Sequence, residues 1–82
     1  MIPRIKNLEA LEDYRLKVIF DDGVRVIYDL KDDIAAIDDF KVLLTERNLF
    51  ENAQLDSSRT CVFWNDRVDL ASDSILEYGI RY

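Results

Sequence analysis

Apolar and polar residues alternate strictly over residues 14–30, the clearest pattern in the chain. The runs 14–20 and 24–30 each carry an apolar residue at every second position. Because successive side chains of a strand point to opposite faces, each run predicts a half-buried β-strand. The Asp-Asp-Gly sequence at 21–23 is typical of a short hairpin loop, in which Gly23 can adopt a positive φ. We therefore expect a β-hairpin.

A loop at 21–23 also fixes which residues of the two strands lie opposite each other. The expected apolar pairs on one face are Tyr14 with Leu30, Leu16 with Tyr28, Val18 with Val26 and Phe20 with Val24. On the other face Arg15 lies opposite Asp29, a favourable pair of opposite charges. A slip of one residue would expose the whole apolar set, so the register is strongly specified.

The residues before the hairpin alternate more weakly. The weak alternation runs over residues 2–8 and predicts a strand that ends near Leu11. Pro3 has no backbone N–H, which suits the start or the edge of a sheet. We therefore expect an edge strand beside the hairpin.

After the hairpin the period of the apolar positions changes from two to between three and four. Ile37, Phe40, Leu43 and Leu44 recur at the spacing of one helical face. This pattern predicts one main helix over residues 34–47 that covers the apolar face of the hairpin.

The rest of the chain predicts a second hairpin and a short helix. The expected segments are a weak strand at 51–55, a turn at 56–59, a strand at 60–64, a turn at 65–67 and a short strand at 68–70. Ser72 or Ser74 can cap a final helical turn or two that runs through Tyr78 and stops at Gly79. The prediction is one α+β domain, 1–82. It has a small antiparallel sheet of about four to five strands in two hairpins, one main helix and a short C-terminal helix.

Cysteine content and hydropathy indicate the compartment in which the protein is expected. The single cysteine, Cys61, cannot form an intrachain disulfide, which favours a reducing compartment. The N-terminus lacks the long apolar run of a signal peptide. No stretch approaches the roughly 20 apolar residues of a membrane helix. We expect a soluble cytoplasmic protein without membrane contact.

The charge balance bears on partners. Seventeen acidic residues against eleven basic ones give a net charge of −6, which disfavours direct binding to nucleic acid. The densest charged run is acidic and contains Asp29, Asp32, Asp33, Asp38 and Asp39. It can be a solvated loop that enters a helix N-terminus, where carboxylates are favourable. The alternative is mimicry of a phosphate backbone or an attraction site for a basic partner, with Asp32 and Asp33 as contact residues.

Candidate catalytic groups are few. The chain has no histidine, the commonest general base and metal ligand. Cys61 lies in an apolar run and is interpreted as a small buried hydrophobic residue. The Asp pairs lack the ligand spacing of a calcium loop, and only two glycines leave no phosphate-binding loop. We expect a protein that is not an enzyme and has no metal or other cofactor.

Three apolar residues are candidates for a partner-binding surface. Ile19 and Ile27 lie on the outer face of the hairpin, beside Lys17 and Arg25. They can contact a partner, join two protomers or lie under the chain's own remaining strands, and the last alternative is favoured. Trp64 is the third candidate, because Trp is enriched in binding hot spots, although a core position is favoured.

Several short motifs follow one another along the chain: Tyr14-x-Leu16-x-Val18-x-Phe20-Asp21-Asp22-Gly23, Tyr28-Asp29-Leu30, Phe40-x-x-Leu43, Leu49-Phe50, Thr60-x-Val62-x-Trp64-Asn65, Val68-Asp69-Leu70 and Ile75-Leu76-Glu77-Tyr78. In this order they resemble one family of small bacterial proteins, the domain of unknown function 2442. They span nearly the whole chain. The sequence departs from the family where Asp66-Arg67 follows Asn65, because the family tends to have Asn-Gly after the tryptophan.

The resemblance implies a compact α+β domain with no established activity and no catalytic residues. Members are at times joined to a helix-turn-helix domain and are often encoded beside a small protein, as in toxin–antitoxin pairs. No helix-turn-helix segment follows Tyr82, so DNA binding by that route is not expected.

Three hypotheses follow, and the first is favoured. It is a non-catalytic interaction module, the acidic and antitoxin-like partner of a small basic protein. The second is a nucleic-acid-associated regulator that uses Arg15, Lys17 and Arg25, provided that Lys41 and Arg59 converge on the same face. The third is an enzyme with a carboxylate-only or metal-assisted site. An unpaired edge strand would also allow a homodimer.

Overall fold

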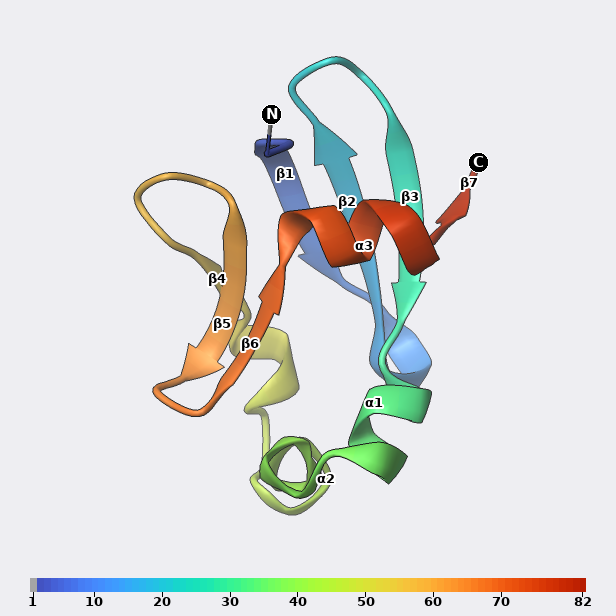
Figure 1. The fold of residues 1–82 in the computed structure, drawn as a ribbon. Coiled ribbons are helices and arrows are strands. Elements are labelled where there is room, and N and C mark those ends of the chain that lie inside the picture. Colours follow the sequence, from blue (N-terminus) through green and yellow to red (C-terminus); the bar gives the residue numbers. More distant parts are fainter. Residues whose placement is uncertain (1) are drawn as a thin grey trace.

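The computed structural model describes residues 2–82, which form two antiparallel sheets and several short helices (Figure 1). The strands are β1 (Ile5–Ala10), β2 (Arg15–Phe20), β3 (Arg25–Asp29), β4 (Gln54–Leu55), β5 (Cys61–Asn65), β6 (Val68–Ala71) and β7 (Ile80–Arg81). The α-helices are α1 (Lys31–Ala36), α2 (Val42–Thr45) and α3 (Ser72–Tyr78). Short 3₁₀ segments are η1 (Glu12–Tyr14), η2 (Asp38–Lys41) and η3 (Phe50–Asn52).

The predicted hairpin is confirmed, including its register. Leu16 lies opposite Tyr28, Val18 lies opposite Val26, and Arg15 lies opposite Asp29. The apolar members of these pairs are buried. Gly23 adopts a φ of 89° in the loop, the conformation for which glycine was expected.

The predicted edge strand is also confirmed. The larger sheet has the order β1-β2-β3-β7, which places β1 at one edge. Its pairing with β2 shifts between Ile5 and Asn7, an irregularity that bends the strand at that point. The backbone N–H of Ile5 donates to the carbonyl of Arg59 at 2.8 Å, so this end of the edge is covered by the chain itself.

The single sheet that we expected is in fact two sheets. The second sheet has the order β4-β5-β6, and its residues Val62, Val68 and Leu70 share one apolar core with the hairpin. Arg59, with a φ of 61°, turns the chain just before β5. The second hairpin therefore meets β1 at the Ile5–Arg59 hydrogen bond and packs across the core.

The prediction of one helix over residues 34–47 was wrong. The segment breaks at Ile37, whose backbone is extended (φ −115°, ψ 116°), and forms α1, η2 and α2. Asp38 and Asp39 follow the break, and short polar side chains of this kind compete with helical backbone bonds. Lys41 Nζ donates to the carbonyl of Ile34 at 3.2 Å, which satisfies an acceptor that the broken helix leaves free.

The break also changes which residues of the predicted stripe are buried. Phe40 and Leu43 lie in the core, whereas Ile37 is 44% exposed and Leu44 is 54% exposed. Figure 1 shows α1 and α2 beyond the end of β3, while α3 lies across the larger sheet. The inner face of the hairpin is thus covered by α3 and the second sheet rather than by one main helix.

The C-terminal helix is confirmed as α3, but its predicted serine cap is not present. No side-chain hydrogen bond caps α3, and the Ser72 hydroxyl donates instead to the carbonyl of Pro3 at 2.6 Å. After Gly79 the chain continues as β7, which pairs antiparallel with β3 and was not predicted. No helix formed by residues 2–82 is long and apolar enough to cross a membrane.

Two side chains hold the turns of the second hairpin. Asp56 Oδ1 accepts from the backbone N–H of Thr60 at 3.0 Å and of Cys61 at 3.2 Å. Asn65 Oδ1 accepts from the backbone N–H of Arg67 at 2.8 Å. The second turn is therefore held by the Asn65 side chain.

Candidate functional site

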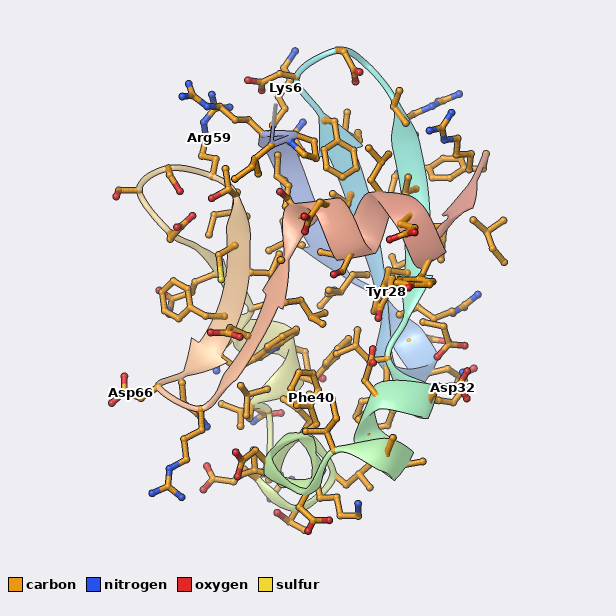
Figure 2. All side chains as sticks on the ribbon, in the orientation of Figure 1. Lys6, Tyr28, Asp32, Phe40, Arg59 and Asp66 are labelled. Carbon is orange, nitrogen blue, oxygen red and sulfur yellow. The ribbon has the colours of Figure 1, made fainter. Side chains whose placement is uncertain are left out.

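A cleft of about 640 Å³ lies where β3, α1, the end of α3 and β7 meet. We call it the acidic cleft. Its lining residues are Arg15, Ile27, Tyr28, Asp29, Asp32, Asp33, Tyr78 and Ile80. Figure 2 shows Tyr28 next to α3 and Asp32 beside α1, on the same side of the molecule. The cleft brings together three of the five predicted contact residues, Ile27, Asp32 and Asp33.

One wall of the acidic cleft is apolar, and the sheet register builds it. Ile27 of β3 lies opposite Ile80 of β7, so both side chains leave the sheet on its outer face. Ile80 is 75% exposed and Tyr78 is 71% exposed. The wall exists because the chain reverses at Gly79, immediately after α3, and returns along β3.

The cleft also holds three carboxylates, which have different environments. Asp29 accepts from the backbone N–H of Lys31 at 2.8 Å and pairs with its ammonium group at 3.0 Å. Partial burial raises the pKa of Asp29, but these contacts outweigh it and the pKa lies below its ordinary value. Asp32 is exposed and makes no hydrogen bond or ion pair with any residue that the structure describes.

The third carboxylate, Asp33, is held by Tyr28. Most of the Tyr28 side chain is buried, and its hydroxyl donates to Asp33 Oδ2. Burial, followed by the neighbouring carboxylate, raises the pKa of Tyr28, so its hydroxyl stays a neutral donor. The Asp33 side chain is therefore fixed at the cleft, with Oδ1 not used by this hydrogen bond.

Of the predicted cations Arg15, Lys17 and Arg25, only Arg15 lines the acidic cleft. All three lie on the outer face of the larger sheet. Arg15 and Lys17 project from β2, and Arg25 projects from β3. Carboxylates face two of them across the strands, because Glu9 lies opposite Lys17 and Asp29 lies opposite Arg15. The Arg25 guanidinium lies over the ring of Tyr82, 5.1 Å from its centroid.

Lys41 and Arg59, which the nucleic-acid hypothesis also required, do not join this cationic face. Lys41 bonds the carbonyls at the end of α1. Arg59 pairs with Asp21 through two bonds of 2.7 and 2.9 Å, and this contact holds the pKa of Asp21 below its usual range. Both side chains have structural roles in the chain itself.

Ile19 and Ile27 are half-buried on the outer face, but they lie in different surroundings. Ile19 lines a separate hollow with Asn7, Leu8, Glu9 and Lys17. Ile27 has Lys17 on one side and Ile80 on the other. Of the predicted pair, only Ile27 belongs to the acidic cleft, and its neighbouring strand β7 flanks it.

Trp64 and Cys61 lie away from the acidic cleft. Trp64 is 6% exposed, its Nε1 donates to the Phe50 carbonyl at 3.0 Å, and its ring stacks on Phe50. Trp64 is thus part of the core. Burial raises the pKa of the half-buried Cys61 thiol, which disfavours a thiolate. Within residues 2–82, no group of three or more Cys, Asp or Glu is placed to hold a metal ion.

A comparison with family models matches residues 5–81 to the protein of unknown function DUF2442. The chain belongs to this family. The match covers nearly the whole chain, from β1 to β7. The comparisons with curated proteins and with solved structures each found no significant match.

Most motif residues of this DUF2442 member are core residues. Leu16, Val18, Val62 and Ile75 are fully buried, whereas the motif residues Tyr28, Asp29 and Tyr78 line the acidic cleft. Sequence reasoning missed Tyr78 and Ile80 as site residues. Their signal was an apolar residue on each side of the glycine that stops α3.

Proposed function

We propose that this protein is a non-catalytic interaction module that binds a small basic protein through the acidic cleft. The observation that carries the proposal is the cleft's composition: exposed Tyr78 and Ile80 line the same cleft as carboxylates that include the unpaired Asp32. Exposed apolar side chains that gather beside fixed polar groups are typical of binding surfaces. The carboxylates of the cleft favour a partner of positive charge.

Charge and burial together favour a basic partner. The chain carries a net charge of −6, which attracts cationic proteins over distances up to about 10 Å at ordinary salt. Inside the cleft, Asp32 and Asp33 would pair with the partner's cations, and the apolar wall would exclude water from those pairs. The first effect speeds association, and the second gives affinity.

The proposed role is that of the acidic member of an antitoxin-like pair. Complex formation would bury Tyr78 and Ile80, which the isolated chain leaves in water. The single half-buried cysteine suits a reducing compartment, so we propose the cytoplasm as the place where the pair forms.

Co-purification from the natural source at natural expression tests the proposal. The wild-type chain should recover one small basic protein in stoichiometric amount, identified by mass spectrometry. Asp32→Lys should lose it. Asp39→Lys is the matched control, because it makes the same charge change at an exposed carboxylate outside the cleft. Equal recovery by both variants, or no basic partner with wild type, would contradict the proposal.

A direct nucleic-acid role is the second candidate, and one observation favours it. Arg15, Lys17 and Arg25 project from the same sheet face, and Tyr82 lies against Arg25 as a surface aromatic ring. Glu9 and Asp29 lie opposite two of the three cations and weaken the case. Salt-dependent retardation of DNA or RNA in a gel, abolished by Lys17→Glu, would support this role.

A further inference from the structure

We propose that the acidic cleft selects an arginine side chain of its partner over a lysine. The proposal rests on the proposed function and names the group that the cleft takes. It follows from three features of the cleft: the apolar wall, the spread of the carboxylates and the exposed ring of Tyr78.

The apolar wall suits a side chain with a long aliphatic stem. Ile27 and Ile80 lie side by side across the β3–β7 pair, and Tyr78 precedes them at the end of α3. Arginine and lysine both bury methylene groups along such a surface while the charged end reaches polar atoms. The wall therefore requires a long basic side chain but does not choose between the two.

The carboxylates favour a planar, branched cation. Asp32 and Asp33 are consecutive residues in the first turn of α1, so their side chains leave the helix about 100° apart. Asp33 Oδ2 already accepts from Tyr28, which fixes the direction of its second oxygen. A guanidinium presents five N–H donors in a fork and can bond both carboxylates, whereas an ammonium is a compact point charge.

The exposed ring of Tyr78 adds to this preference. A guanidinium stacks on an aromatic face and is less strongly hydrated than an ammonium. The chain makes both contacts elsewhere with its own arginines: Arg25 lies 5.1 Å from the Tyr82 ring centroid, and Arg59 forms a two-bond pair with Asp21. The acidic cleft would offer one partner arginine both kinds of contact at the same time.

The charge balance of the cleft leaves room for one incoming cation. Asp29 is paired with Lys31, and Arg15 Nε donates to the Glu12 carbonyl at 3.2 Å. Asp32 and Asp33 then remain without a cationic partner among residues 2–82. A second copy of this chain also carries a charge of −6, so like-charge repulsion disfavours it as the occupant.

Blocked tripeptides test the choice of side chain. The probes are acetyl-Thr-X-Thr-amide, in which X is arginine, lysine or citrulline, the uncharged isostere of arginine. Each probe is titrated into the full-length ¹⁵N-labelled chain, and binding is followed by NMR shifts of the backbone amides. The arginine probe should shift the amides of Ile27, Asp33 and Ile80. It should bind about fivefold more tightly than the lysine probe, and citrulline should not bind measurably.

Two variants separate the ring from the rest of the wall. Tyr78→Leu keeps an apolar side chain but removes the ring, so the arginine-to-lysine ratio should fall to about one. Tyr82→Leu removes a ring outside the cleft and should leave the ratio unchanged. Tyr78 is largely exposed, so neither result depends on a fragile core position.

The possible outcomes decide between the inference and the proposed function. Equal affinity for arginine and lysine at the cleft would overturn arginine selection and leave the basic-partner proposal intact. Shifts confined to other surfaces, or none, would overturn the inference, while co-purification would still judge the proposed function separately. A stable dimer in sedimentation that Ile80→Ser dissociates would identify a second copy as the occupant and would also overturn it.

Discussion

Replacement of Gly79 by alanine should destabilise the protein strongly, because position 79, just before β7, lies too close to β3 and α3 for any side chain. A Cβ at position 79 would lie 2.0 Å from Val26 Cγ1 and 2.6 Å from the Ile75 carbonyl oxygen. The Val26 side chain is fully buried and the carbonyl belongs to the backbone of α3, so neither can move freely. The chain must shift β7 away from β3 to accommodate the methyl group.

The magnitude follows from these two contacts. Overpacking a well-packed site costs roughly 1–3 kcal/mol, and two contacts below 3.0 Å place Gly79→Ala at the upper end, about 3 kcal/mol. A chain of 82 residues has a free energy of unfolding of roughly 4–12 kcal/mol. The expected loss lowers the melting temperature by about 12–24 °C, which thermal unfolding by circular dichroism measures directly.

Gly23 is the matched control, because its backbone conformation, and not the space around a side chain, requires glycine. A Cβ there meets nothing within 4 Å, but the φ of 89° is unfavourable for residues other than glycine. Gly23→Ala should cost about 1–2 kcal/mol, and Gly23→Asn should cost less, because asparagine adopts positive φ more readily. Val26→Ala combined with Gly79→Ala should cost less than the sum of the single changes. If Gly79→Ala lowers the free energy of unfolding no more than Gly23→Ala does, the close approach of Gly79 to Val26 and Ile75, on which the cleft wall depends, is wrong.

Three further variants test other parts of the account by urea unfolding. Asp21→Asn should remove a pH-dependent part of the stability. Arg59 lowers the pKa of Asp21, so the pair stabilises the fold above the ordinary pKa of 3.8. This contribution is lost as the pH falls through the lower pKa of the folded state. The gap between wild type and Asp21→Asn should therefore be wider at pH 7 than at pH 2, and a constant gap would contradict the pairing. Trp64→Phe should cost about 1–3 kcal/mol, since the buried Phe50 carbonyl loses the Nε1 donor, and a neutral result would place the indole elsewhere. Leu43→Ala should cost about 2–5 kcal/mol and Leu44→Ala less than about 0.5 kcal/mol; similar costs would favour one continuous helix over the break at Ile37.

Local alternation predicted the hairpin and its pairing, because both depend on residues close in sequence. Val18 and Val26 are eight positions apart, and their pairing follows from the length of the loop between them. The short helix through Tyr78 and its stop at Gly79 were predictable for the same reason. These features are specified by strand period, turn chemistry and helix termination.

The features that depend on distant contacts were not predictable. Ile37 lies in an apolar stripe at helical spacing, yet its backbone is extended, and Lys41 then bonds the carbonyls left at the end of α1. The bond between Ile5 and Arg59, which joins the two sheets, links residues 54 positions apart. Hydrophobic periodicity describes one segment at a time, so it does not predict contacts between residues far apart in the sequence.

The candidate site was predictable only in part. Asp32, Asp33 and Ile27 were identified from charge and alternation, but their proximity depends on where α1 leaves β3. Tyr78 and Ile80 joined them only because β7 returns along β3, a pairing made possible by the missing side chain at Gly79. The residue types were visible in the sequence, whereas their convergence required the fold.

Photo-crosslinking in the natural source tests most directly whether a basic protein occupies the acidic cleft. A photoreactive benzoylphenylalanine replaces Ile80 in one variant and Leu44, which is also exposed but lies outside the cleft, in another. Irradiation should join the position-80 variant covalently to one small basic protein and should leave the position-44 variant uncoupled. Adducts at both positions alike, or at position 44 alone, would contradict a partner seated in the acidic cleft.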